Sequence, residues 1–381
     1  MVELVKGFKD FVGDEAIKRS EIKKILVEIF EGYGFEPAET PIIESEKFVR
    51  GENPQDEAVS DIFKLRDKGG RELALRYEFT FQLKRISKNK RLPYKRYQIG
   101  EVFRDEPISS RRFRQFTQCD IDTVGSGLKE EAEILSIIND VFLRLGIKPI
   151  ILVNNRKFLN EVLDNIKISE KSRRGYILRE IDKIDKVGEM VVKNNLKKIE
   201  CAEVIDILKN NDEIKKLVSY KEISELINFC KENYGVKINF LPTLVRGLSY
   251  YNGSIFEVKS EDFKESLGGG GSYLVNGIES TGFSFGLERI CQLAKIDIKK
   301  EKILIISLGK DKEAIRLAKK IRSKQKIVSI FYGKPSKALE YANSYRYTHA
   351  IFVGEEETKK NKFKIKDLTT GEEKKLEIDN D

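Results

Sequence analysis

Residues 96–123 hold the side chains of this chain best suited to chemistry. Their pattern predicts two strands around a short charged loop, and alternate residues of a strand lie on the same face. On the second strand Phe116, Gln118, Asp120 and Asp122 therefore share a face. A strand facing an apolar core should not carry a glutamine and two carboxylates on one side. The pattern favours a polar ligand on this face; the alternative is a solvated hairpin with a charged tip.

Arginines cluster in the loop of this hairpin and recur in two later segments. They are Arg104, Arg111, Arg112, Arg114, Arg246 and Arg289. Guanidinium groups suit the binding of phosphate oxygens. The chain has no P-loop and no GxGxxG after a first strand. A site that binds ATP without a P-loop needs cations for the phosphates, an aromatic platform for the base and acidic oxygens for Mg²⁺.

Composition limits the possible classes of function. The 381 residues suffice for two or three domains, and the net charge of +9 favours a nucleic acid partner. No apolar run approaches the ~20 residues of a membrane span, and the first residues lack a secretory signal. Four scattered cysteines predict reduced thiols, so we expect a cytoplasmic protein. A single histidine excludes Ser-His triads and most histidine-based metal sites.

The apolar spacing also predicts the elements around this hairpin. They are a helix over 14–30, an extended edge segment around Pro37 and Pro41, paired strands over 62–67 and 70–80, a helix over 134–145 and a strand over 148–154. Residues 157–239 then change to a lysine- and glutamate-rich helical pattern. We interpret this segment as a helical insertion; the alternative is that it continues the same domain.

Strand and glycine signals return after residue 240. Strands are expected over 244–258 and 266–277, and 282–290 reads as a strand that runs into a helix beginning near Gly286. The glycines at 268–271 allow a sharp turn or close approach to a ligand, although a glycine run by itself usually marks a loop. From residue 303 alternating strands and helices predict a small three-layer α/β domain. His349 opens one of its strands, where we expect a structural role.

Three segments together resemble one known family. FRDE…RRFRQFTQCDID, LVRGLSYYNG and GFSFGLERI resemble motif 2, the histidine-binding signature and motif 3 of the histidyl-tRNA synthetases. VKGFKDF, LRYEFT and IKDLTTGEE also match, so the resemblance spans nearly the whole chain. It implies an α+β fold: a class II antiparallel sheet flanked by helices, built from 1–156 and 240–297. A helical insertion, 157–239, and a C-terminal α/β anticodon-binding domain, 300–381, complete it.

The resemblance also implies the reaction and its partners. Histidine attacks the α-phosphate of ATP, forming histidyl-adenylate and pyrophosphate, and the 3′-terminal adenosine of tRNA(His) then takes the histidyl group. Mg²⁺ would bind together with ATP, and the sequence does not identify its protein ligands. No tightly bound cofactor is implied. The family is normally a homodimer through the segment around Pro41.

By motif position, the resemblance implies two groups of site residues. Those for ATP are Arg104, Glu106, Arg112, Phe116 and Arg289. Those for histidine are Glu78, Thr80, Gln118, Asp122, Arg246, Tyr250, Tyr251 and Tyr273. Arg104 and Arg246 would act on the α-phosphate as catalytic residues, because preorganised charge there stabilises the transition state without a base.

The chain departs from the family pattern in three places. Ser249 stands where the family usually has Asp, residues 107–111 form an atypical motif 2 loop, and the glycine-rich segment lacks the Arg and Asp usual beside Tyr273. The motif 2 loop usually helps to read the acceptor end of the tRNA.

The sequence leaves three other interpretations to compare with this one. A catalytically inactive relative, such as the regulatory subunit of ATP phosphoribosyltransferase, would typically lack the C-terminal domain and degrade the segment around Arg246. LVRGLSYY and TQCDID favour histidine over another amino acid. A binding module without turnover would have no reason to keep every phosphate-binding arginine.

Overall fold

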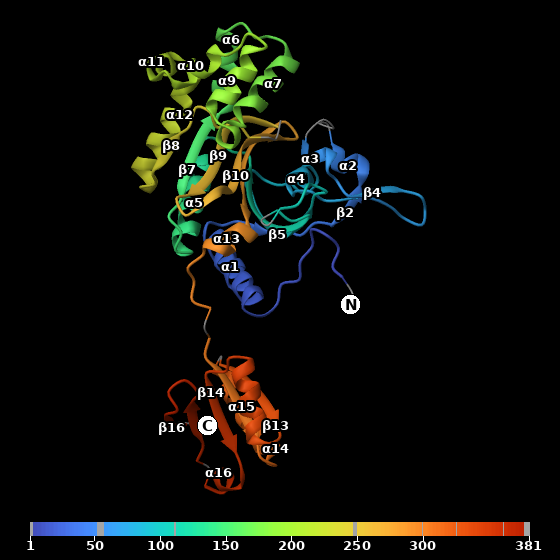
Figure 1. The fold of residues 1–381 in the computed structure, drawn as a ribbon, viewed down its shortest axis with the longest axis vertical. Coiled ribbons are helices and arrows are strands. Elements are labelled where there is room, and N and C mark those ends of the chain that lie inside the picture. Colours follow the sequence, from blue (N-terminus) through green and yellow to red (C-terminus); the bar gives the residue numbers. More distant parts are fainter. Residues whose placement is uncertain are drawn as a thin grey trace. The chain divides into compact units, whose positions relative to one another are not determined.

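The chain folds into two compact units, Met1–Ile296 and Asp297–Asp381. The computed structural model describes residues 3–51, 57–109, 112–246, 250–298, 300–324, 326–360 and 362–376. Each unit has its own sheet, helices and apolar core (Figure 1). The mixed helix and sheet architecture agrees with the α+β class predicted from the sequence.

An eight-stranded sheet forms the centre of the first unit. In spatial order its strands are β1 (Glu36–Pro37), β5 (Tyr94–Phe103), β6 (Gln115–Val124), β11 (Ile278–Gly286), β10 (Phe263–Val275), β9 (Tyr251–Ser260), β7 (Ile150–Asn155) and β8 (Ile238–Phe240). Neighbours are antiparallel except β1 with β5 and β7 with β8. The predicted hairpin therefore consists of β5 and β6. On its other side β6 pairs with β11, which in turn pairs with β10, the strand that contains the glycine run.

Three helices cover one face of this sheet. They are α1 (Gly13–Gly32), α5 (Leu128–Arg144) and α13 (Leu287–Leu293). Ile22, Leu26 and Phe30 follow helical spacing on α1 and are fully buried, as expected for an amphipathic helix. Phe30 packs against Phe285 of β11 with ring centroids 5.7 Å apart. With this face filled by apolar side chains, the opposite face can carry polar ones.

A smaller three-stranded sheet lies beside β5. Its spatial order is β2 (Ile43–Ser45), β4 (Glu72–Leu75) and β3 (Lys64–Arg66), with helices α2 (Glu46–Arg50), α3 (Glu57–Ser60) and α4 (Thr80–Ile86) around it. The pairing of β3 with β4 is as predicted, but the expectation of a strand through residue 80 is wrong. The Arg76 N–H donates to the Ile42 carbonyl, while the Arg76 carbonyl accepts from Phe103 of the large sheet. The chain thus crosses from one sheet to the other at this point and enters α4.

Seven α-helices and a short π-helix lie between β7 and β8 among the described residues. They are α6 (Arg156–Asn165), α7 (Lys171–Ile181), α8 (Ile184–Val187), α9 (Glu189–Lys197), α10 (Glu203–Lys209), α11 (Asn211–Lys216), α12 (Val218–Phe229) and η1 (Cys230–Tyr234). They gather at one end of the large sheet, in green and yellow in Figure 1. Their apolar side chains join the same core as the sheet. The boundaries of a separate insertion domain stay a prediction.

The second unit is a three-layer α/β fold. Its sheet has the order β13 (Ile327–Tyr332), β12 (Lys302–Ser307), β14 (His349–Val353), β15 (Lys364–Asp367) and β16 (Glu373–Lys375), the first three parallel. Alternate residues of β12 pack on α14 (Asp311–Ser323) and, on the other face, α15 (Pro335–Ser344). The additional helix α16 (Glu355–Lys360) was not predicted, because its six residues include no apolar side chain.

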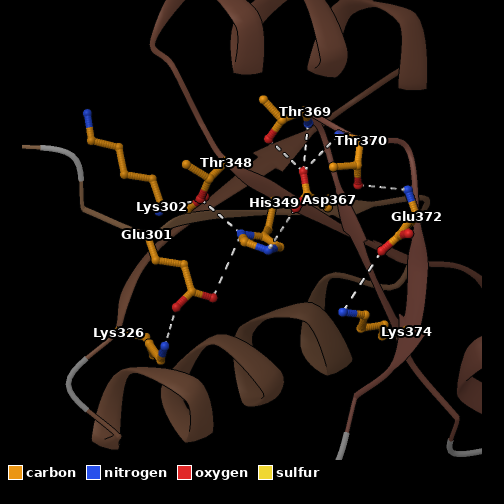
Figure 2. Close-up of polar contacts among 10 residues, drawn as sticks. All are labelled: Glu301, Lys302, Lys326, Thr348, His349, Asp367, Thr369, Thr370, Glu372 and Lys374. Carbon is orange, nitrogen blue, oxygen red and sulfur yellow. Dashed lines mark hydrogen bonds and ion pairs between the residues drawn. The ribbon is translucent and has the colours of Figure 1, made fainter.

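His349 opens β14 and is surrounded by polar groups (Figure 2). Its Nδ1 lies 2.9 Å from the Thr348 hydroxyl and 3.8 Å from Glu301 Oε1, and its Nε2 lies 4.0 Å from Asp367 Oδ2. The hydroxyl and amide groups of Thr369 hold the pKa of Asp367 down at about 2. His349 thus lies among polar groups from neighbouring elements, and the structural role expected for it stays a prediction.

Candidate functional site

A cavity in the first unit opens on the polar face of the sheet. It has a volume of about 570 Å³ and is walled by β6, β10, β11, the start of α13 and the segments before β9 and α4. Every site residue named from the sequence lines it. These are Glu78, Thr80, Arg104, Glu106, Arg112, Phe116, Gln118, Asp122, Arg246, Tyr250, Tyr251, Tyr273 and Arg289. The structure therefore brings together residues that are far apart in the chain, while the role of each remains a prediction.

The alternation of β6 explains why its polar residues meet in the cavity. Phe116, Gln118, Asp120 and Asp122 line it, while Cys119, from the other face, is fully buried in the apolar core. The strand can keep two carboxylates on one face because that face looks into a polar cavity rather than a packed core. The interpretation of the hairpin as a solvated tip does not fit this arrangement.

Asp122 sits at the buried end of the cavity, between the guanidinium group of Arg96 and the phenol of Tyr273. Arg96, its direct cross-strand partner on β5, places Nη2 2.7 Å from Asp122 Oδ2. The phenol of Tyr273 donates to Asp122 Oδ1. Burial raises the pKa of Asp122, and the charge of Arg96 opposes this rise. The result is a fixed hydrogen-bonding group suited to the ring N–H of a small heterocycle.

Asp120 also lines the cavity, although the family resemblance did not name it as a site residue. Burial, together with the neighbouring carboxylate of Asp122, raises the pKa of Asp120 to about 7. Its Oδ1 has no hydrogen-bond partner among the described residues. A buried carboxyl with an open oxygen and a perturbed pKa is typical of a functional site. Its place on the polar face of the strand was the signal that could have identified it.

Glu78 and Thr80 line the cavity where the chain leaves β4 and enters α4. Glu78 is 4% exposed. The Tyr250 hydroxyl lies 3.4 Å from Glu78 Oε2 and donates to it. The ring of Tyr250 packs against Tyr251 and Tyr273, at centroid distances of 4.8 and 5.5 Å. A carboxylate and a hydroxyl at the edge of an aromatic wall suit a small ammonium ligand.

Arginines line another part of the cavity. Arg104 donates through Nε to the Tyr77 carbonyl at 3.1 Å, and its guanidinium carbon lies 5.2 Å from the centroid of the Phe116 ring. Glu106 lies 3.8 Å from Arg104 and 3.2 Å from Arg112, between the two guanidinium groups. This part of the cavity therefore combines an aromatic face with cations able to bind phosphate oxygens.

Arg246 and Arg289 supply the remaining cations of the cavity. Arg246 Nη1 lies 3.1 Å from Glu257 Oε2, and its buried Nε has no partner among the described residues. Arg289 donates to the Ser266 carbonyl at 2.6 Å. Burial, with the charge of Arg112 nearby, lowers the pKa of Arg289. The guanidinium groups are thus gathered before any ligand is bound, which lowers the cost of organising them around an anion.

The glycine run lies in the middle of β10, not in a loop as such runs usually do. A Cβ at Gly269 would lie 2.3 Å from the guanidinium carbon of Arg246. A Cβ at Gly270 would lie 2.0 Å from the Gly282 carbonyl oxygen on β11. Glycine is needed at position 269 because the Arg246 side chain lies directly against β10, and at position 270 because β10 and β11 approach closely there.

Three further residues of the site carried no usable sequence signal. Arg96 is fully buried behind Asp122, Glu257 pairs with Arg246, and Lys186 reaches the cavity from α8. Each owes its place to strand register or to the packing of a distant helix. Two positions noted in the sequence, Ser249 and Arg111, fall outside the described residues.

The described ranges lack two other kinds of site, a cluster of metal ligands and a membrane-spanning helix. No group of three or more His, Cys, Asp or Glu side chains there could hold a metal ion. Among the same residues, no helix has both the length and the apolar character needed to cross a membrane.

Comparison with known proteins extends over both units. The family described as histidyl-tRNA synthetase matches residues 7–290, and the family described as anticodon binding domain matches residues 302–380. The histidine–tRNA ligase 1 of Bacillus cereus is 32% identical, with 98% of this chain and 97% of that protein covered. The histidine–tRNA ligase of Nanoarchaeum equitans is also 32% identical, with 98% and 96% covered.

Among solved structures, histidyl-tRNA synthetase from Nostoc sp. superposes with a TM-score of 0.85 at 25% identity, over 98% of this chain and 96% of that one. The family match covers most of the first unit, and the relatives cover nearly the full length. The chain therefore belongs to the histidyl-tRNA synthetase family.

Proposed function

We propose that the cavity activates histidine with ATP and that the chain transfers the histidyl group to tRNA. The chain is a histidine–tRNA ligase by family. The reaction of its class proceeds in two steps through an aminoacyl-adenylate. The main observation behind this assignment is that one cavity contains both a set of arginines and a buried hydrogen-bonding pair. Arginines suited to phosphates line one part, and the buried pair of Asp122 and Tyr273 closes the other.

The first step needs charge rather than a base. The carboxylate of histidine attacks the α-phosphate of ATP, and pyrophosphate leaves. Arg104 would hold the α-phosphate and the substrate carboxylate, and Arg246 would provide the second cation where negative charge develops. Donors fixed in place before the reaction stabilise such a transition state without reorganisation. The anchoring of Arg104 on a backbone carbonyl and of Arg246 on Glu257 supports these roles.

ATP would lie across Phe116. Its adenine would stack on that ring with Arg289 on the opposite side, Glu106 would bind the adenine edge, and Arg112 the outer phosphates. Glu106 now lies between two arginines, and phosphates would compete with its carboxylate for them. Mg²⁺ would arrive on the phosphates of ATP and neutralise their charge, because that ion usually keeps substrate oxygens and water as ligands.

Histidine would occupy the buried end of the cavity. Glu78 and Thr80 would receive the α-ammonium group and Gln118 the carboxylate side. Asp122, with Tyr251 and Tyr273, would bind the imidazole. An imidazole has a donor or acceptor at each ring nitrogen, and a carboxylate beside a phenol matches that edge. Asp122 Oδ2 is ion-paired with Arg96 but has no hydrogen-bond partner among the described residues. An amino acid without a ring N–H would leave this buried oxygen without a hydrogen bond and would be disfavoured.

The second step requires the 3′ end of tRNA(His) at the mouth of the cavity. The terminal adenosine hydroxyl would attack the adenylate carbonyl, the acyl–phosphate bond would break and AMP would leave. Residues 107–111 would lie at the acceptor end. The second unit would bind the anticodon, in keeping with its family match and with the chain's net charge of +9. A homodimer through the segment around Pro41, and a cytoplasmic location, belong to the same proposal.

ATP–pyrophosphate exchange with the full-length protein tests this function. We expect exchange that depends on histidine, followed by transfer of labelled histidine to tRNA(His) when that tRNA is added. Every other amino acid should support exchange far more weakly at equal concentration. Exchange without an amino acid preference, or faster exchange with another amino acid, would contradict the proposal. Exchange with histidine but no transfer would leave the adenylation site intact and refute the assignment of the tRNA.

A further inference from the structure

A short helix outside the sheet contributes a residue to the cavity wall. Lys186, on α8, is the one described cavity residue that comes from the helices between β7 and β8. It is exposed and makes no ion pair with a described residue. The other cavity cations, Arg104, Arg112, Arg246 and Arg289, come from the sheet, its loops and α13. A lysine ammonium at such a wall is free to bind a phosphate oxygen as a point charge.

The residue before Lys186 begins a row of ion pairs that ends at Arg246. Asp185 pairs with Lys259 of β9, and Lys259 Nζ lies 3.6 Å from Glu257 Oε1. The other oxygen of Glu257 lies 3.1 Å from Arg246 Nη1. Glu257 and Lys259 are two residues apart on one strand and so share a face, which explains why both can meet the same helix and the same arginine.

This row determines how strongly Glu257 holds Arg246. One carboxylate is shared between Arg246 and Lys259, and Asp185 attracts Lys259 from the other side. Without the lysine charge, the full attraction of Glu257 would fall on Arg246 and would compete with a phosphate for the guanidinium. Glu257 and Lys259 are 15% and 26% exposed as side chains, so solvent screens this part of the row only partly.

We propose that α8 is part of the adenylation site. Lys186 binds the phosphates of ATP and the pyrophosphate product, and Asp185 acts through Lys259 and Glu257 as a positioning residue for Arg246. This inference rests on the proposed use of the cavity for ATP. It gives the helical segment a part in amino acid activation, before any tRNA is bound.

The first test replaces Lys186 in the full-length protein. Lys186→Ala should raise the KM for ATP and for pyrophosphate in the exchange reaction by about threefold to tenfold, which is the range of one partly screened charge contact. The KM for histidine should stay unchanged, and Lys186→Arg should restore most of the loss. Lys183→Ala is the matched control, because Lys183 pairs with Glu180 and lies outside the cavity lining. Equal values for the Lys186 and Lys183 variants would overturn the proposal.

The second test addresses the row of ion pairs. Lys259→Met should lower the kcat of histidine-dependent exchange by about tenfold through a misplaced Arg246, with the KM for histidine and the melting temperature near those of the wild type. Lys259→Arg should restore the rate. If Lys259→Met and Lys259→Arg both exchange more slowly and both melt at a lower temperature, the role of Lys259 is merely structural. That result would overturn the proposed positioning of Arg246 by the row of ion pairs. If the wild-type protein itself fails to exchange with histidine, the proposed function fails instead.

Discussion

Arg96 and Asp122 face each other directly across β5 and β6, with a nitrogen–oxygen distance of 2.7 Å and side-chain exposures of 0% and 5%. The pair closes the end of the cavity that we assign to the imidazole of histidine. A charge buried without its partner is strongly unfavourable, so the two residues depend on each other. This dependence can be measured separately from catalysis.

Replacing Arg96 by methionine should destabilise the protein and weaken histidine binding. Loss of one partner of a buried ion pair typically costs about 3–5 kcal/mol of unfolding free energy. Urea unfolding measures this cost, and the KM for histidine in exchange measures the effect on the site. The double variant Arg96→Met with Asp122→Asn should recover part of the stability, since the unpaired charge is gone. Equal stability of the single and double variants would show that the ion pair does not matter.

Asp120 should make the stability of the protein depend on pH. Folding raises its pKa to about 7, whereas an aspartate in the unfolded chain titrates near 4. The folded state therefore keeps a proton that the unfolded state releases, and the free energy of unfolding falls as the pH rises from about 4 to about 7. Asp120→Asn should lack this fall. Relative to wild type it should gain on the order of 2 kcal/mol between pH 5 and pH 8.

Urea unfolding at the two pH values checks the Asp120 prediction. Asp206→Asn is a suitable control, because Asp206 is an exposed carboxylate, with 63% of its side chain accessible, that pairs only with Lys193 among the described residues. The same pH dependence in wild type and in Asp120→Asn would contradict the assignment of the titration to this residue.

Arg246→Ala should slow adenylation by about a hundredfold or more and leave histidine binding largely intact. Glu78, Asp122 and Tyr273 would still hold the amino acid, because Arg246 acts mainly at the α-phosphate. Removing one preorganised donor from a developing charge commonly has an effect of this size. Single-turnover formation of the adenylate separates the rate from the affinity for histidine. Arg144→Ala, an exposed substitution outside the cavity lining, provides the control. An unchanged rate would remove Arg246 from the catalytic residues.

Gly269→Ala should act on catalysis, whereas Gly270→Ala should act on folding. The added methyl at Gly269 meets the mobile end of Arg246, so the guanidinium must move and adenylation should slow by about tenfold or more. The methyl at Gly270 meets the backbone of β11, which cannot yield without separating the strands. Melting temperature and exchange rate distinguish the two outcomes. Gly32→Ala, where a Cβ has nothing within 4 Å, should change neither.

Much of the fold could be predicted from local patterns. Period-two alternation placed Phe116, Gln118, Asp120 and Asp122 on one face, and helical spacing marked α1 and α5. These patterns can be recognised from the sequence because the residues that define them are close together along the chain. The family motifs then named residues that the structure brings to one cavity. The end of β4 was missed because the pairing of Arg76 with two sheets is not a local property.

The tertiary structure decided the partners of those residues. Arg96 lies behind Asp122 because of the register of β5 with β6, and a shift by one residue would put it on the other face. Lys186 reaches the cavity from α8, whose Asp185 pairs with Lys259 of β9, far away in the sequence. Periodicity tells which face a side chain occupies, but only the long-range packing determines what lies opposite it. The sequence alone thus determined the family and the polar face of β6. The long-range packing decided which charged residues lie beside that face and which partners fix its side chains in place.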